Sequence, residues 1–127
     1  TVEDLMLSGK KIPFVNENVS MKDALMSINK KNLGTLVIRN NRSYTTGILT
    51  DGDLKRINNL KPSFKDLKLK KVMKQRPISV DKDMLAAQAL SIMNNKKITS
   101  LCVHKNSKKN KTIGFIHIHN ILNANIT

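Results

Sequence analysis

The sequence predicts an α+β fold built from two copies of one strand–helix–strand–strand–helix unit. The first observation is an internal repeat, because residues 2–56 and 69–124 present the same order of apolar segments, turns and glycines. The second is that the copies align without a gap over residues 15–38 and 80–103. The third is size, because a half of about 60 residues buries little surface on its own. We therefore expect the copies to pack sheet to sheet about a pseudo-twofold axis, with clefts at their interface.

The alignment of the two copies also sets the expected domain organisation. We expect the first repeat over residues 1–58 and the second over 69–127, joined by a linker over 59–68 that contains Pro62 and a short turn. The chain opens with Thr1 rather than Met, so we expect it to be a piece of a longer protein.

Local signals place the elements of the first half. Ser20 can cap a helix start, and Asp23 lies in the positively polarised first turn of that helix. The helix is expected to carry its apolar residues inward and to end near residues 32–34. The elements that follow are predicted as a strand over 35–38, a polar turn over 40–43, a strand over 44–49 and a helix over 52–58.

The second half repeats this order. We predict a helix over 84–94, a strand over 100–104, an exposed hairpin loop over 105–111, a strand over 112–117 and a helix over 119–124.

The charge of the chain bears on its partners. Lysine and arginine number 23 against 9 aspartates and glutamates, and the formal net charge is +14. This charge favours an anionic ligand and is also typical of nucleic-acid-binding surfaces. However, the lysines are spread along the chain in short groups, and aromatic residues, which stack on bases, make up only 3%. We therefore expect a small anionic ligand rather than a nucleic acid.

Cysteine usage and hydropathy bear on the compartment. Cys102 is the single cysteine, so no internal disulfide can form, which fits a reducing, cytoplasmic setting. No apolar run approaches the roughly 20 residues that span a bilayer, and no signal-peptide pattern opens the chain. We expect a cytoplasmic protein that does not enter a membrane.

The segment Gly47-Ile-Leu-Thr-Asp-Gly-Asp-Leu54 carries the clearest chemistry. A strand is expected to end at Thr50, with a helix beginning within two residues. The Thr50 hydroxyl, the Asp53 carboxylate and the free N–H groups of the helix then converge on one point. Such N–H groups suit a phosphate, and a carboxylate can accept hydrogen bonds from ribose hydroxyls. The alternative is that Thr50 and Asp53 only cap their helix.

The same segment has the Asp-x-Asp spacing of a haloacid-dehalogenase-type phosphatase, with Asp51 as nucleophile and Asp53 as acid/base. The chain is short for such an enzyme, and it offers no convincing set of metal ligands downstream. The equivalent second-half residues are Ile118 and Asn120. A lone motif needs its structural context, so the phosphatase is kept as an alternative.

The second-half counterpart of this segment carries histidines. His117 replaces Thr50, Asn120 replaces Asp53, and His119 lies between them. Histidines at a helix start can donate to a phosphate, and they introduce pH dependence near neutrality. The pairs Cys102-x-His104 and His117-x-His119 are also spaced like metal ligands along a strand. We favour packed or ligand-facing side chains and expect no metal.

These residues resemble a known family. The doubled pattern, with Gly-Ile-Leu-Thr-Asp-Gly-Asp-Leu closing the first copy, resembles a tandem CBS-domain pair, or Bateman module. The resemblance implies that Thr50 and Asp53, with the intervening Asp51, hold the ribose and phosphate of an adenine nucleotide. It also implies where a base is seated. The base would be seated by Ile12 and Pro13, in the stretch from Ile12 to Val15, and by Gly34 and Thr35, in the turn after Leu33.

A closer resemblance covers the whole chain. The segments Thr50-Asp-Gly-Asp-Leu-Lys-Arg56 and Gly114-Phe-Ile-His-Ile-His119 are similar to those of bacterial D-arabinose 5-phosphate isomerases. Those enzymes carry an N-terminal sugar-isomerase (SIS) domain before two CBS domains and serve 3-deoxy-D-manno-octulosonate (Kdo) and lipopolysaccharide synthesis. Two residues depart from their pattern: Asn120 stands where Asp is usual, and Lys97 where an aromatic residue or His is common.

The sequence therefore predicts the regulatory CBS pair of such an isomerase, without catalytic residues or a required cofactor of its own. We expect a homodimer that binds an adenine nucleotide or CMP-Kdo. The first-half site is expected to favour a ribose-bearing ligand, and the site of His117, His119 and Asn120 a sugar acid or phosphate. The alternatives are a CBS pair of another enzyme or transporter, the small phosphatase and a basic nucleic-acid binder.

Overall fold

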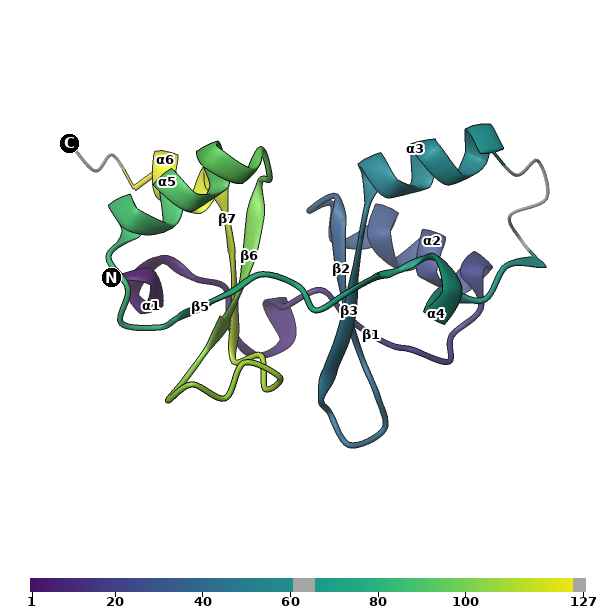
Figure 1. Cartoon of the computed structure of the whole chain (residues 1–127), viewed down its shortest axis with the longest axis horizontal. Coiled ribbons are helices and arrows are strands. Elements are labelled where there is room, and N and C mark those ends of the chain that lie inside the picture. Colours follow the sequence, from purple (N-terminus) through teal and green to yellow (C-terminus); the bar gives the residue numbers. More distant parts are fainter. Residues whose placement is uncertain (61–65, 125–127) are drawn as a thin grey trace. The chain divides into compact units, whose positions relative to one another are not determined.

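The computed structural model describes residues 1–60 and 66–124, apart from the side chains of 59 and 60. Each half contains the predicted strand–helix–strand–strand–helix order, so the α+β fold class is confirmed (Figure 1). The chain forms two compact units. One contains Thr1–Ile12 together with Ile78–Thr127, and the other contains Pro13–Pro77.

The unit Pro13–Pro77 is built on a mixed sheet in the order β1-β2-β3-β4, in which β1 and β2 are parallel and the other pairs antiparallel. The helices α2 and α3 lie on one side of this sheet (Figure 1). The elements are β1 (Phe14–Asn16), α2 (Met21–Lys31), β2 (Thr35–Arg39), β3 (Thr45–Thr50), α3 (Asp51–Leu60), α4 (Leu69–Val72) and β4 (Lys74–Gln75).

The predicted cap of α2 is present. The Ser20 hydroxyl accepts a hydrogen bond from the Asp23 N–H at 3.1 Å, which satisfies one of the free N–H groups of the first turn. The helix ends where Asn32 adopts a left-handed conformation with φ 55°. Its apolar face packs on the sheet, and the buried residues of this core are Met21, Ala24, Ile28, Leu36, Ile38, Leu49 and Leu69.

The other unit is built on a three-stranded sheet in the order β5-β6-β7, again with one parallel and one antiparallel pair. Its elements are α1 (Val2–Leu5), the 3₁₀ turn η1 (Gly9–Lys11), β5 (Ser79–Asp81), α5 (Ala86–Lys96), β6 (Ser100–His104), β7 (Gly114–His117) and α6 (Ile118–Leu122). Its core is formed by Val2, Val80, Ala86, Ala89, Met93, Leu101, Val103, Ile116 and Ile121.

The segments that open the two repeats are exchanged between the units. The backbone of Leu7 pairs with that of Phe115 in both directions, at 2.8 and 2.9 Å, and Met6 packs over Gly114. In the other unit, Met73 packs over Gly47 and β4 pairs with β3. In each case the glycine leaves room that a Cβ atom would fill, so the methionine sulfur approaches the strand backbone.

Several expected element boundaries differ by a few residues. The helix predicted over 84–94 runs over Ala86–Lys96, because Met84 closes a turn on Asp81 and Leu85 is extended. The strand predicted over 112–117 begins at Gly114, and the last helix begins at Ile118. Part of the predicted linker lies at residues 61–65, outside the described residues. The repeat boundaries, and the packing of the halves about a pseudo-twofold axis, stay predictions.

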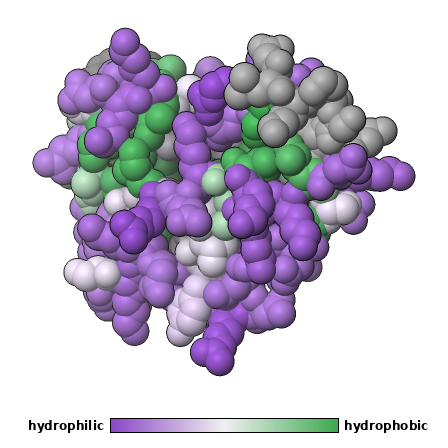
Figure 2. Space-filling view, turned by 45° about the vertical axis from the view of Figure 1, so that its right-hand side comes forward, coloured by the Kyte–Doolittle hydropathy of each residue, from purple (hydrophilic) through white to green (hydrophobic). Residues whose placement is uncertain are grey.

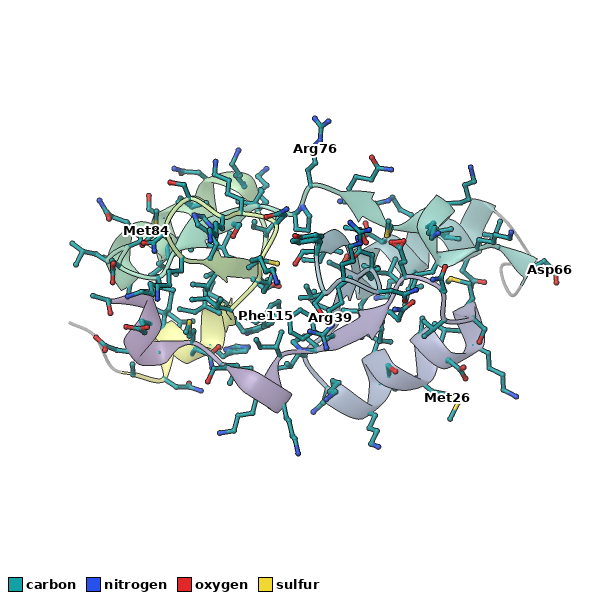
Figure 3. The ribbon with its side chains drawn as sticks, turned by 90° about the horizontal axis from the view of Figure 1, so that it is seen from below. Met26, Arg39, Asp66, Arg76, Met84 and Phe115 are labelled. Carbon is teal, nitrogen blue, oxygen red and sulfur yellow. The ribbon has the colours of Figure 1, made fainter. Side chains whose placement is uncertain are left out.

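The surface agrees with the composition. Hydrophilic side chains predominate on the face shown in Figure 2. Single apolar side chains are also exposed, such as Met26, which projects outward from α2 (Figure 3). In the part of the chain that the structure describes, no helix is long and apolar enough to cross a membrane.

Candidate ligand-binding site

Most of the predicted first-half site residues meet at one end of the sheet of unit Pro13–Pro77. The parallel strands β1 and β2 start at this end, and the antiparallel β3 finishes there. The Pro13 carbonyl accepts from the Val37 N–H at 2.8 Å, and Thr35 is the register partner of Thr50. The topology thus brings Pro13, Thr35 and Thr50 to the same end of the sheet. Ile12 belongs to the other compact unit, and its part in a base-binding site stays a prediction.

Gly34 lies directly against the start of α3. Its carbonyl accepts from the Asp51 N–H at 3.0 Å, and its φ of +68° is a conformation that favours glycine. A Cβ atom at this position would come within 3.0 Å of the Asp51 Oδ2. The left-handed backbone of Gly34 therefore favours glycine, and a larger residue would also have to displace the Asp51 carboxylate.

Thr50 and Asp53 bind each other across the first turn of α3. The Thr50 hydroxyl accepts from the Asp53 N–H at 3.1 Å, and the Asp53 Oδ2 accepts from the Thr50 N–H at 3.1 Å. This reciprocal arrangement is a capping box, which satisfies two backbone donors. The capping role that the sequence left open is thus present, and any ligand that uses these groups must share them with the helix.

The Asp53 carboxylate has two cationic neighbours that the sequence reading missed. Its side chain is only 3% exposed, and its Oδ1 pairs with the Arg56 guanidinium and, at 3.3 Å, with the Lys74 ammonium. Arg56 lies one turn along α3, whereas Lys74 comes from β4. A buried carboxylate needs compensation, and these cations provide it. Only the i,i+3 spacing of Asp53 and Arg56 could have been read locally.

The second-half counterpart has the same backbone design with different side chains. The Asn120 Oδ1 accepts from the His117 N–H at 2.8 Å, and the Thr99 carbonyl accepts from the Ile118 N–H at 2.7 Å. These bonds match those of Asp53 and Gly34. His117 Nδ1 accepts from the His119 N–H at 3.1 Å, and the two rings stack with centroids 4.9 Å apart.

The protonation of the second-half site follows from this geometry. Burial, together with the charge of His119, lowers the pKa of His117 below its ordinary value. His117 is therefore neutral at physiological pH, with its proton on Nε2 because Nδ1 accepts. The sequence suggested that His117 donates to a phosphate. At physiological pH the Nε2–H can do so, whereas the doubly protonated ring requires acidic conditions.

The alternative metal site has no support from the geometry. Cys102 is buried in the core, and burial raises the pKa of its thiol to about 11. His104 instead lies with its Nδ1 2.6 Å from the Ser79 hydroxyl, which joins β6 to β5. Among residues 1–60 and 66–124, no three His, Cys, Asp or Glu side chains are grouped so that they could hold a metal ion.

The chain belongs to the CBS domain family. The family model matches residues 2–58 and again residues 69–126, so the chain is a tandem pair. It is 36% identical over 125 residues to "Arabinose 5-phosphate isomerase KdsD" of Salmonella typhimurium, and 35% identical to the protein of that name from Escherichia coli K12. Each of these matches covers 98% of this chain and 37% of the relative.

Solved CBS pairs have the same fold. CBSX2 in complex with AMP gives a TM-score of 0.84 at 22% identity, covering 98% of this chain and 95% of that one. The CBS pair of MJ0100 in complex with 5'-methylthioadenosine and S-adenosyl-L-methionine gives 0.83 at 18% identity, covering 98% of both. The chain spans 37% of the length of the curated relatives it matches.

Proposed function

We propose that this chain is the ligand-sensing regulatory CBS pair of an arabinose 5-phosphate isomerase. The observation that carries the proposal is the 36% identity to such an isomerase over 98% of the chain. The parent reaction would convert ribulose 5-phosphate to arabinose 5-phosphate for Kdo and lipopolysaccharide synthesis. An N-terminal SIS domain of the same cytoplasmic parent chain would perform it, and the pair would form a homodimer.

The first-half site is the proposed place for the ligand. Thr50, Asp51 and Asp53 lie at the start of α3, beside Pro13, Gly34 and Thr35 at the end of the sheet. Hydroxyl, carboxylate and helix N–H groups suit a ribose and a phosphate together. The adenine-derived ligands of the structural relatives support a nucleotide, and the pathway of the isomerases supports CMP-Kdo.

The test is a binding screen with the 127-residue chain. A ligand that binds only the folded state raises the melting temperature by mass action, so AMP, S-adenosyl-L-methionine and CMP-Kdo can be ranked by thermal shift. We expect saturable binding of a nucleotide-containing ligand. No binding by any of them in calorimetry would contradict the proposal.

Two matched variants locate the site. Asp53→Ala removes a charged carboxylate acceptor from the first half, whereas Asn120→Ala removes a neutral amide acceptor from the second half. A lost hydrogen bond to a charged group costs roughly ten- to a hundredfold in affinity. We therefore expect this loss for a nucleotide from Asp53→Ala and a smaller one from Asn120→Ala. Equal losses would contradict the proposed difference between the halves.

A further inference from the structure

Lys74 lies beside the proposed site because of its place in the fold. It belongs to β4, and its register partner Ile48 is two residues before Thr50 on β3. The preceding residue, Met73, packs over Gly47 and thereby holds this segment against the strand. From here the Lys74 ammonium reaches the Asp53 Oδ1 at 3.3 Å. The pairing of β4 with β3 therefore sets the position of this cation.

The buried Asp53 carboxylate has more cationic partners than it needs, while the second carboxylate of this helix start, Asp51, is exposed. One carboxylate, 3% exposed, faces two cations, Arg56 and Lys74, whose side chains are each 62% exposed. Arg56 approaches from within α3 and can neutralise Asp53 without help. Lys74 supplies a second positive charge whose remaining donors face solvent. An excess cation next to a hydroxyl and a helix start attracts an anion.

In the second half, uncharged residues replace all three of these charged residues. The offset of 67 residues that relates Gly114 to Gly47 and Met73 to Met6 also relates Lys74 to Leu7, Asp53 to Asn120 and Arg56 to Asn123. The second half therefore keeps the fold and the capping hydrogen bond without any of the three charges. Neither the strand pairing nor the helix start requires Lys74.

We infer that Lys74 is a specificity-determining residue of the first-half site, selecting ligands that carry an anion beside the sugar. The inference rests on the proposed function, because it assigns a role within that site. A sugar diol that donates to the Asp53 Oδ1 competes with Lys74 for this oxygen. A neutral nucleoside leaves the displaced ammonium without an anionic partner, whereas a nucleotide offers its phosphate. Lys74 thus favours the phosphorylated ligand over the nucleoside.

The test compares matched ligands on matched variants by calorimetry at low ionic strength, where screening is weak. The ligands are AMP and adenosine, with CMP and cytidine as a second pair. The variants are Lys74→Gln, Lys74→Arg and the control Lys71→Gln, an exposed lysine on α4. We expect Lys74→Gln to weaken nucleotide binding roughly three- to tenfold, a range discounted for an exposed cation. The same variant should strengthen nucleoside binding slightly, because the competition for the Asp53 Oδ1 is removed. Lys74→Arg and Lys71→Gln should retain the wild-type preference.

The outcomes separate the two proposals. If the wild-type chain binds a nucleotide and Lys74→Gln loses nucleotide and nucleoside equally, Lys74 only holds the site together and the inference is wrong. An unchanged nucleotide affinity in Lys74→Gln overturns it as well. If the wild-type chain binds none of the four ligands or CMP-Kdo, the proposed function itself fails, and the inference with it.

Discussion

Replacing Asp53 separates the capping role of this side chain from its charge. Asp53→Ala removes the acceptor for the partly buried Thr50 N–H, and a lost cap costs about 0.5–2 kcal/mol. It also leaves Arg56 and Lys74 facing each other without the carboxylate. Asp53→Asn can keep the capping bond, because Asn120 makes the same bond at 2.8 Å in the other half. The asparagine variant loses the attraction to two exposed cations, about 0.2–1 kcal/mol for each such pair, and its NH2 group replaces the oxygen that faced them.

We therefore expect a graded loss of stability. Asp53→Ala should lower the free energy of unfolding by about 2 kcal/mol and Asp53→Asn by about 1 kcal/mol. For a chain of this length, each kcal/mol corresponds to roughly 4 °C in melting temperature. The chain has no tryptophan, so denaturant unfolding is best followed by far-UV circular dichroism without ligand. Asn120→Ala is the control, since it removes an equivalent cap that carries no charge.

Two results would refute this reasoning. If Asp53→Asn is as destabilised as Asp53→Ala, the charge rather than the capping bond holds the helix start. If Asp53→Asn is more stable than the wild type, the cost of burying the carboxylate exceeds what its two cations return.

Three further outcomes are expected. Burial lowers the pKa of His104, so on acidification the unfolded chain takes up a proton at a higher pH than the folded chain does. The free energy of unfolding should therefore be highest above about pH 6.5 and should decrease below it. In denaturant titrations, His104→Gln should make this decrease smaller. Gly114→Ala places a Cβ against the Met6 sulfur and should cost about 1–3 kcal/mol in thermal unfolding, partly restored by Met6→Ala. The chain should hydrolyse no sugar phosphate, because Asp51 lacks metal-ligand partners among the described residues; magnesium-dependent hydrolysis that Asp51→Asn abolishes would contradict this.

The local features of the fold were readable from the sequence because short-range physics fixes them. Ser20 and Asn32 bound α2 as their cap chemistry predicts, and β6 was predicted over its observed residues, 100–104. The sequence also predicted that Leu36, Leu101, Ile48 and Phe115 would be buried. This is observed for Leu36, Leu101 and Phe115, whereas Ile48 is only partly buried. These outcomes depend on capping hydrogen bonds and on short apolar runs within a few residues of the chain.

The long-range features were not readable in the same way. The two-residue strand β4 has no alternation pattern of its own, and its pairing with β3 depends on Met73 packing over Gly47. Lys74 consequently lies beside Asp53 although it is outside the sequence motif by which the site was recognised. Thr50 and Asp53 were found because motif and local structure coincide. Lys74 could have been found only from its contrast with Leu7 in the repeat.

The exchange of the opening segments gives the chain an order of assembly during synthesis. The unit Pro13–Pro77 is continuous in sequence and can fold once its own residues have left the ribosome. Met6, in contrast, is made about a hundred residues before Gly114, the position on which it packs. At translation rates of about 5–20 residues per second, this delay lasts on the order of 5–20 s. The Val2–Leu5 helix carries Glu3 and Asp4 beside Val2, which is buried in the complete fold. Val2 therefore stays exposed until β7 has been made, and during this delay a chaperone can bind the segment.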